Sequence, residues 1–167
     1  MKKIILDLGC GSRKYDGAIG IDRVPVPGVD IIADLNKKLP IKDDSVDLIY
    51  SYHFLEHVDN FLFIVEEMYR VARNRAIIQI RVPYFMCFDA FTDPTHRNFF
   101  TERAFDYFAD KIYYNYYSRA KFKILKKNLV INPNLRNRIL SFFIPKRYLK
   151  AIFDVYNEIE FELEVMK

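Results

Sequence analysis

The chain has no tryptophan, two cysteines and five glycines among its 167 residues. Two cysteines are too few for a disulfide framework, and a chain of this length buries enough surface to fold without a disulfide or a metal. Glycine, together with seven prolines, is too scarce for a fibrous or low-complexity protein. No apolar run approaches the ~18 residues that a membrane-spanning helix needs. The sequence therefore predicts a single domain over residues 1–167, without linkers or internal repeats.

The first residues also lack the features of a secretion signal. The apolar run that begins at Ile4 ends at the acidic Asp7, whereas the apolar core of a signal peptide spans roughly 7–15 residues. We therefore expect a cytoplasmic protein.

Charged and aromatic residues are unevenly distributed. Residues 1–60 hold 8 basic and 10 acidic side chains, residues 61–117 hold 7 of each, and residues 118–167 hold 11 and 5. The basic stretch 111–150 can bind nucleic acid, an anionic glycan or lipid headgroups, but a solvated face partly neutralised by the C-terminal glutamates is the simpler interpretation. Residues 84–117 hold 13 of the 27 Phe and Tyr, which line a substrate site or fill the core.

Five short apolar segments predict buried strands of a parallel sheet, at residues 4–8, 18–22, 29–34, 46–52 and 76–83. The clearest helix follows the fourth segment, because apolar residues recur at helical spacing from Phe61 to Ala72. We expect Asp59 or Asn60 to cap this helix, and Glu66 to pair with Arg70 on its exposed face. Strands that alternate with a helix in this way predict an α/β fold.

The C-terminal half predicts further elements. A helix capped by Thr101 is expected over residues 101–109, and one or two helices interrupted at Pro145 over 134–157. Another strand begins at Lys121. The last segment, residues 158–165, alternates glutamate with apolar residues, which predicts a strand with one acidic face. Lys121 and Lys123 are expected opposite those glutamates in an antiparallel pair.

Carboxylates lie at or near the ends of the first three predicted strands, where open α/β sheets bind ligands. Asp7 precedes a turn containing Gly9 and Gly11, and glycines allow close approach of a ligand to the backbone. Asp22 ends the second strand, where it can accept hydrogen bonds from ribose hydroxyls, and Asp34 ends the third, where it can hold an exocyclic amine. The loop lacks the motifs of phosphate and dinucleotide sites. Three carboxylates therefore favour a nucleoside that carries positive charge.

The combined pattern of these motifs resembles class I S-adenosylmethionine-dependent methyltransferases, especially the small type 11 group. The residues that carry the resemblance are Leu6-Asp7-Leu8-Gly9-Cys10-Gly11-Ser12, Gly20-Ile21-Asp22, Ala33-Asp34-Leu35, Leu39-Pro40 and the run from Asp47 to Leu55-Glu56-His57. The match extends over about residues 3–110. It implies a Rossmann-like sandwich with a mostly parallel sheet and an antiparallel C-terminal strand. Only ten residues separate Gly11 from Asp22, so we expect the first helix of the family to be shortened to about one turn.

The resemblance also implies roles for particular residues in binding S-adenosylmethionine. Gly9 and Gly11 would contact the methionine moiety, Asp22 the ribose, and Asp34 with the Leu35 backbone the adenine. Residues Ser51 to His53 would line the methyl end. For Asp7, contact with the cofactor through water and support of the glycine turn both stay open.

His96 and His53 are the candidates for catalysis. His96, in the sequence Asp93-Pro94-Thr95-His96, occupies a place where the resembling group also has Asp-Pro-x-His; it can act as general base, contact the substrate or hold a lid. His53 either lines the active site or orients the loop, and His57 is expected to cap or pack at the start of the helix. Cys10 is predicted to fill space in the core. The histidines lack metal-ligand spacing, so no metal site is predicted.

The sequence thus predicts a methyltransferase with residues 1–83 as cofactor half, 84–117 as aromatic lid and acceptor region, and 118–167 as basic C-terminal strands and helices. The expected acceptor is an O or N nucleophile of a small molecule or saccharide, since the tetrapeptide of base amino-methylating enzymes and the Pro-Cys of cytosine C5 enzymes are absent. The alternatives are an RNA-directed methyltransferase, so nucleic acid is a possible but less favoured partner, and a non-catalytic S-adenosylmethionine-binding or interaction protein. The sequence leaves the oligomeric state open.

Overall fold

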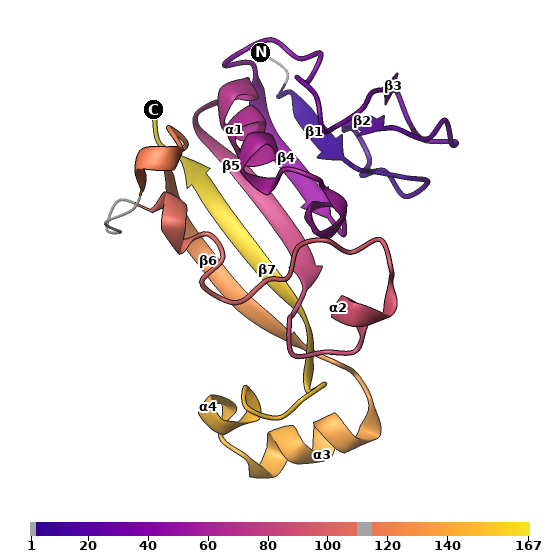
Figure 1. The fold of residues 1–167 in the computed structure, drawn as a ribbon, viewed down its shortest axis with the longest axis vertical. Coiled ribbons are helices and arrows are strands. Elements are labelled where there is room, and N and C mark those ends of the chain that lie inside the picture. Colours follow the sequence, from indigo (N-terminus) through magenta and orange to yellow (C-terminus); the bar gives the residue numbers. More distant parts are fainter. Residues whose placement is uncertain (1–2, 110–114) are drawn as a thin grey trace.

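The computed structural model describes residues 3–109 and 115–167, which form one seven-stranded mixed sheet with helices (Figure 1). The strand order is β3-β2-β1-β4-β5-β7-β6. β1 to β5 are parallel, whereas β7 runs antiparallel to both of its neighbours, β5 and β6. The predicted α/β class, the mostly parallel sheet and the antiparallel C-terminal strand are thus confirmed. The strands are β1 Ile5–Leu8, β2 Ile19–Asp22, β3 Ile31–Ile32, β4 Val46–Tyr52, β5 Ala72–Pro83, β6 Phe122–Ile131 and β7 Tyr156–Val165.

The helices are short, apart from α1. They are α1 Phe61–Val71, α2 Asp89–Thr92, α3 Leu135–Phe143 and α4 Lys146–Leu149, with 3-10 turns η1 Leu55–His57, η2 Asp106–Phe108 and η3 Asn115–Tyr117. The interruption expected at Pro145 is confirmed, because Pro145 separates α3 from α4. Within the described residues no helix is long and apolar enough to cross a membrane.

Helix α1 begins as the sequence predicts. The Asn60 side chain accepts a hydrogen bond from the Phe63 amide at 3.0 Å, so Asn60 is the cap. The expected pair of Glu66 with Arg70 is wrong. Arg70 instead donates to both oxygens of Glu67 at 2.7 Å and also pairs with Asp43. Glu67 is buried. It also accepts a hydrogen bond from the Leu39 amide, and this bond holds its carboxylate within reach of the Arg70 guanidinium.

The alternation in β7 gives the strand two different faces, as predicted. Phe161 and Leu163 are buried, whereas the glutamates that alternate with the apolar residues of the strand are half-buried on the opposite face. Lys123 lies opposite Glu164 in the register with β6, and Lys126 lies 3.2 Å from Glu160. Lys121 precedes β6, so its expected cross-strand place is taken by residues further along.

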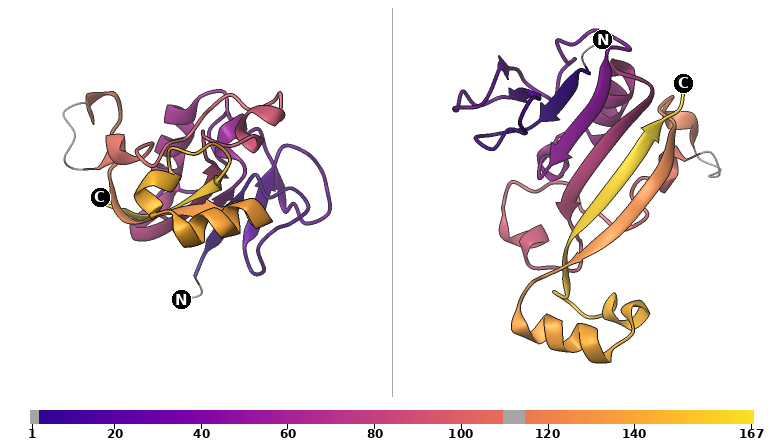
Figure 2. Two further views of the ribbon diagram at one scale, coloured as in Figure 1. Left: turned by 90° about the horizontal axis from the view of Figure 1, so that it is seen from below. Right: turned by 180° about the vertical axis from the view of Figure 1, so that it is seen from behind.

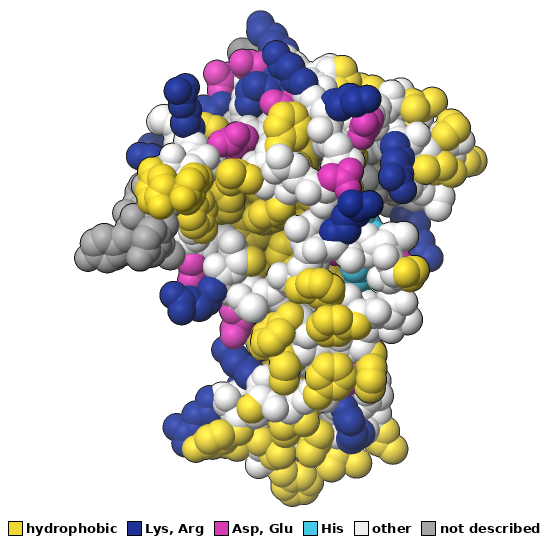
Figure 3. Space-filling view, viewed as in Figure 1, with side chains coloured by type: hydrophobic (Ala, Val, Ile, Leu, Met, Phe, Trp, Pro, Cys, Tyr) yellow, Lys and Arg dark blue, Asp and Glu magenta, His cyan; other side chains and the backbone are white. Residues whose placement is uncertain are grey.

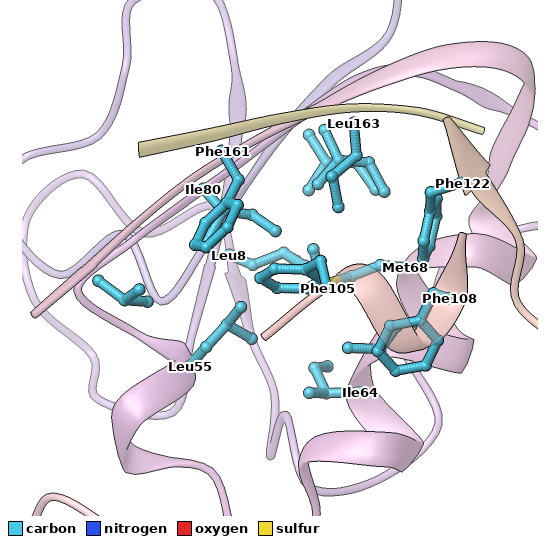
Figure 4. Packing of buried hydrophobic residues seen from close by; sticks show 14 of the residues in the cluster. Leu8, Leu55, Ile64, Met68, Ile80, Phe105, Phe108, Phe122, Phe161 and Leu163 are labelled. Carbon is cyan, nitrogen blue, oxygen red and sulfur yellow. The ribbon is translucent and has the colours of Figure 1, made fainter. Parts of the chain in front are cut away.

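The core lies between the sheet and one layer that α1 and the segment 101–109 form. Figure 4 shows Phe105 and Phe108 of that segment against Met68 of α1 and Phe161 of β7. The helix expected over 101–109 is wrong. The segment forms turns and the single 3-10 turn η2, because Phe105 and Phe108 reach the core without a regular helix. The residues 110–114 of the predicted aromatic region lie outside the described residues.

The opposite face of the sheet carries no helix in the described parts of the chain, and the strands are seen directly from behind in Figure 2. The first helix, expected to be shortened to one turn, is shortened further, since residues 9–18 form only turns. Part of this loop covers the sheet: the Tyr15 ring stacks on Tyr50 with centroids 4.0 Å apart and meets Tyr52 edge-on. The loop therefore replaces a helix over β1 and β4.

Candidate functional site

Three cavities adjoin one another at the carboxyl ends of the parallel strands. One of about 270 Å³ lies beside β2 and the start of the loop after β3, one of about 930 Å³ lies under the 9–18 loop, and one of about 600 Å³ lies beneath segment 89–96. His53, directly after β4, lines all three. The three cavities, together called the groove, therefore share His53 in their walls.

The glycine turn and Asp22 lie together in the groove. Gly9 has φ +70°, and a Cβ there would lie 2.6 Å from the Phe54 ring, so the position requires glycine. Asp22 accepts hydrogen bonds from the Gly11 amide at 2.9 Å and the Val24 amide at 3.0 Å. A Cβ on Gly11 would meet nothing within 4 Å, so the turn has open space beside it. The structure thus brings Gly9, Gly11 and Asp22 together.

Asp7 lies beneath the loop rather than at the mouth of the groove. Its side chain is buried and accepts a hydrogen bond from the Tyr15 amide at 2.9 Å. Burial raises the pKa of Asp7, and the Tyr15 hydrogen bond opposes that rise. Of the two roles considered for Asp7, support of the turn has direct contacts in the structure. The neighbouring Cys10 is also buried. Its burial, and then the negative charge of Asp7, raise the pKa of the Cys10 thiol to about 11, so the thiol stays protonated and unreactive.

Asp34 and Leu35 line the cavity of about 270 Å³ together with Asp22. Asp34 is half-exposed and accepts from the Asn36 amide at 3.1 Å. That bond, and then Lys37, holds the pKa of Asp34 below its usual range, so the carboxylate is available as an acceptor. The buried Leu35 gives the cavity an apolar wall. Arg23 and Val24 also line it, and no pattern in the sequence pointed to them.

Ser51 is the predicted cofactor residue that the structure places elsewhere. Its side chain is fully buried on the core side of β4, next to Ile49 in the alternation, and it lines none of the three cavities. The side chain of Ser51 therefore does not reach the groove. The neighbouring His53 does, because a φ of +51° turns the chain outward at that residue.

His53 lies between two carboxylates. Its Nδ1 is 3.4 Å from Glu56 Oε1, and its Nε2 is 3.3 Å from Glu158 Oε1. Glu158 and then Glu56 raise the pKa of His53 to about 9. The imidazole is therefore protonated at neutral pH and suits binding and orientation rather than proton abstraction.

His57 and His96 face each other in the third cavity, with ring centroids 4.7 Å apart. His96 Nδ1 lies 3.0 Å from the Ala90 carbonyl oxygen. Because a carbonyl only accepts, this nitrogen carries the proton and Nε2 keeps a free lone pair in the neutral ring. Of the two roles expected for His57, capping is wrong, because Asn60 caps α1. His57 lies in η1, just before α1, and its Nδ1 contacts Thr95 Oγ1 at 2.9 Å.

Asn98 fixes the segment that carries Thr95 and His96. Its amide side chain donates to the Leu55 carbonyl at 3.1 Å and the Val58 carbonyl at 2.8 Å. The backbone amides of Arg97 and Asn98 both donate to the Glu56 carbonyl. These bonds attach the loop after β5 to the turn after β4, so residues about forty positions apart share one cavity.

The wall of the third cavity is polar, and the described residues that segment 84–117 contributes to it, between 89 and 96, include no Phe or Tyr. Its lining residues are His53, Glu56, His57, Pro83, Asp89, Thr92, Asp93, Pro94, His96, Asn157 and Glu158. The aromatic residues of 84–109 instead divide between the core, as Phe100 and Phe105 do, and the surface, as Phe88 and Phe91 do. Glu56, Asp93 and Glu158 were not predicted as site residues. The Leu-Glu-His motif contained Glu56, but nothing in it indicated burial.

Comparison with known proteins relates this groove to a family. Residues 6–80 match the family model of a methyltransferase domain, type 11. No curated protein matches the chain in sequence. Among solved structures it is similar to a SAM-dependent methyltransferase from Archaeoglobus fulgidus, with 18% identity, a TM-score of 0.63, and coverage of 97% of this chain and 86% of that chain.

Two further structures share the fold. A chain in the complex between the Haloferax volcanii Trm112 methyltransferase activator and a methyltransferase has 13% identity and a TM-score of 0.66, covering 99% of this chain and 83% of that chain. The [4+2]-cyclase SpnF has 14% identity and a TM-score of 0.64, covering 98% and 75%. The match over residues 6–80 and the shared fold thus confirm the resemblance to class I S-adenosylmethionine-dependent methyltransferases of type 11 and imply S-adenosylmethionine as the cofactor.

Proposed function

We propose that this protein transfers a methyl group from S-adenosylmethionine to an O or N nucleophile of a small molecule or saccharide. The observation that carries the proposal is that the cavities of the groove share His53 in their walls. The carboxylates at the ends of β2 and β3 lie in one arm, the His57–His96 pair lies in the other, and His53 lies where the arms meet. Cofactor and acceptor would therefore meet beside His53.

The residues present fit the cofactor. Asp22 and Asp34 keep unused lone pairs toward a cavity with the apolar wall of Leu35, which suits ribose hydroxyls and an adenine. The open space beside Gly11 leaves the backbone accessible to the methionine moiety. When bound, S-adenosylmethionine supplies an electrophilic methyl group on a sulfonium. In the other arm, His96 lines the acceptor cavity with its Nε2 3.9 Å from Asp93 Oδ2, and in the neutral ring this nitrogen can take up the proton that the nucleophile loses.

The chemistry of the acceptor cavity favours a hydroxyl-rich molecule. Carboxylate and amide groups, such as those of Asp89, Asp93 and Asn157, line it and can accept and donate hydrogen bonds to sugar hydroxyls. Among the described residues no Phe or Tyr ring lines this cavity for stacking on a base. Its carboxylates would also repel a phosphate backbone, which argues against an RNA acceptor. A cytoplasmic location is part of the proposal.

Calorimetry with S-adenosylmethionine and S-adenosylhomocysteine, followed by a screen of saccharide and small-molecule acceptors, tests this function. We expect both cofactor forms to bind, and the Asp22→Ala variant to bind each at least tenfold more weakly because a carboxylate acceptor is lost. Glu66→Ala, which removes a carboxylate on α1 outside the three cavities, is the control. If neither cofactor form binds the protein, the proposal is wrong. If both bind and no acceptor is methylated, a non-catalytic role is favoured.

A further inference from the structure

The acceptor arm contains a buried carboxylate without a hydrogen-bond partner. Glu56 is 1% exposed, and among the described residues neither of its side-chain oxygens accepts a hydrogen bond. An ionised carboxylate in this state is unfavourable unless cations compensate it, and the protonated His53 compensates one of its oxygens. His53 Nδ1 lies 3.4 Å from one oxygen, at the rim of the cavity. The other oxygen needs a different partner.

His57 and His96 complete a set of possible metal ligands with Glu56. One donor atom from each of the three residues lies within 4.8 Å of the others. Both imidazoles are oriented by outer partners. His96 Nδ1 donates to the Ala90 carbonyl, and Thr95 donates its hydroxyl proton to Asp93 at 2.7 Å, so its oxygen accepts from His57 Nδ1. Both rings therefore hold Nε2 unprotonated when neutral, as metal-ligating histidines do.

We propose that Glu56, His57 and His96 bind a divalent transition metal ion. Two imidazoles and one carboxylate suit Mn²⁺, Fe²⁺, Co²⁺ or Zn²⁺, and three protein ligands leave coordination positions open to the cavity. No pattern in the sequence indicated this site, because His57 and His96 are far apart along the chain. They come together through the hydrogen bonds of Asn98, those of the Arg97 and Asn98 amides to Glu56, and that of Thr95 with His57.

The metal site gives the acceptor arm a specific task, and this part rests on the proposed function. The ion binds an acceptor hydroxyl and lowers its pKa, so that the proton leaves to solvent. The oxygen lone pair then forms the C–O bond as the C–S bond of the cofactor breaks, which yields a methyl ether and S-adenosylhomocysteine. In this arrangement His96 acts on the acceptor through the metal rather than as a direct base.

Titration of the metal-free protein with Co²⁺, followed by visible absorption, tests the site without cofactor or acceptor. We expect saturation at one ion per chain and loss of the bands in Glu56→Gln and His96→Asn. Thr95→Val, which removes only the outer partner of His57, should weaken binding by about 10–100-fold. Glu66→Gln, the same change on the surface of α1, is the control, and circular dichroism establishes that each variant folds.

The outcomes separate this inference from the proposed function. Absence of Co²⁺ binding, or unchanged binding in Glu56→Gln, overturns the metal site even if S-adenosylmethionine binds and is used. In the assay of turnover, we expect a chelator to abolish methylation and Co²⁺ or Mn²⁺ to restore it. Methylation that persists in the chelated protein but is lost in His96→Asn would identify His96 as a direct base and overturn the role of the metal.

A second and independent feature is the exposed apolar stripe of α3. Leu135, Ile139, Phe142 and Phe143 are 71%, 51%, 83% and 74% exposed. At 3.6 residues per turn they occupy one sector of about 100°, and Arg136 and Arg138 flank it on either side. The opposite side of the helix is attached to the molecule through Asn137, which is fully buried and donates to the Asp154 carbonyl at 2.7 Å. Because Asn137 attaches the opposite side of α3 to the molecule, the stripe faces solvent.

Basic residues predominate around the stripe, although Arg136 pairs with Asp154 at 3.9 Å and Lys150 with Glu102 at 2.7 Å. Residues 135–150 contain five Lys and Arg and no acidic residue. Figure 3 shows apolar side chains gathered over α3 and α4 at the lower end of the molecule with Lys and Arg beside them. A second copy of this surface would bring like charges together, and RNA would leave Leu135 and Ile139 without a partner. A bilayer with anionic headgroups matches both the apolar sector and its basic flanks.

We infer that α3 and α4 bind the surface of an anionic lipid bilayer. Flotation with vesicles of phosphatidylcholine alone, and of phosphatidylcholine mixed with phosphatidylglycerol, tests this. We expect binding to the mixed vesicles only, weakening as salt is added. Phe142→Ser with Phe143→Ser should reduce it at least tenfold, because two exposed rings no longer enter the interface. Ile32→Ser, which removes an apolar side chain that is 63% exposed on β3, should leave it unchanged.

Three results would overturn the membrane inference. One is the absence of wild-type binding to the mixed vesicles, and another is equal binding by the double Phe variant. The third is a stable dimer in solution that the double Phe variant converts to a monomer, since this would make the stripe an interface between copies.

Discussion

At the scale of single residues, Gly9 is a position where space and backbone conformation both require glycine. We expect Gly9→Ala to lower the free energy of unfolding by about 1–3 kcal/mol, because the new methyl group meets the Phe54 ring and φ is positive. Gly17→Ala is the matched control, since Gly17 has φ +78° but open space around it. Urea unfolding of the two variants measures the difference. Equal stability of the two would contradict the proposed clash.

Asp47 makes folding sensitive to acid. It accepts from the Ile4 amide at 2.8 Å and from Arg73 at 2.6 Å, and these partners, Ile4 first, hold its pKa below the usual range. A carboxyl whose folded pKa is lowered stabilises the fold fully above its unfolded pKa of about 4, and this stabilisation is lost as the pH falls through the folded value.

We therefore expect Asp47→Asn to be less stable than the wild type at pH 7 and to lose less stability on acidification below about pH 4. Thermal unfolding across this pH range measures both effects. Asp16→Asn, at an exposed position, should retain the wild-type profile. Parallel profiles for wild type and Asp47→Asn would show that Asp47 does not couple folding to protons.

At the scale of elements, the loop after β5 depends on Asn98 for its position over the turn after β4. Asn98→Ala leaves the Leu55 and Val58 carbonyls without their donor, at a cost of roughly 1–3 kcal/mol. We expect the variant to lose acceptor methylation more than cofactor affinity, because this loop contributes Thr95 to the cavity beside β2 but five residues to the acceptor cavity. Calorimetry and kcat/KM for the acceptor separate the two, with Asn128→Ala as control on β6. An equal loss of both would show that the arms are not independent.

The element scale also shows where sequence patterns succeed and fail. Strands were predicted well, because a buried parallel strand needs only a short apolar run and a turn after it. Ala104, Phe105 and Phe108 have helical spacing, but they reach the core from turns, so spacing alone predicted a helix that tertiary packing does not require. In the site, Asp22 and Asp34 were found because strand ends converge in any such sheet. Glu56 was missed because its burial depends on a loop forty residues away.

At the scale of the whole molecule, Phe105 joins the two layers. Phe105 is 1% exposed. The centroid of its ring lies 4.9 Å from the ring centroid of Phe161 in β7 and 5.7 Å from that of Phe61 in α1. We expect Phe105→Ala to cost about 3–5 kcal/mol in the free energy of unfolding, since it leaves a cavity between sheet and helix. Phe99→Ala, at a half-exposed ring, should cost far less. Similar losses in the two variants would place the principal packing elsewhere.

The two edge strands of the sheet affect the tendency of the folded protein to aggregate at high concentration. A sheet that is not closed into a barrel ends in two edges whose free backbone groups can recruit a strand from another copy. Here the edges differ. β3 is only two residues long and offers little to pair with, whereas β6 spans ten residues. Along β6, exposed Lys123, Lys126 and Lys127 would meet the same lysines in an approaching copy. The short β3 and the repulsion between lysines of β6 thus both oppose aggregation of the native fold through its sheet edges.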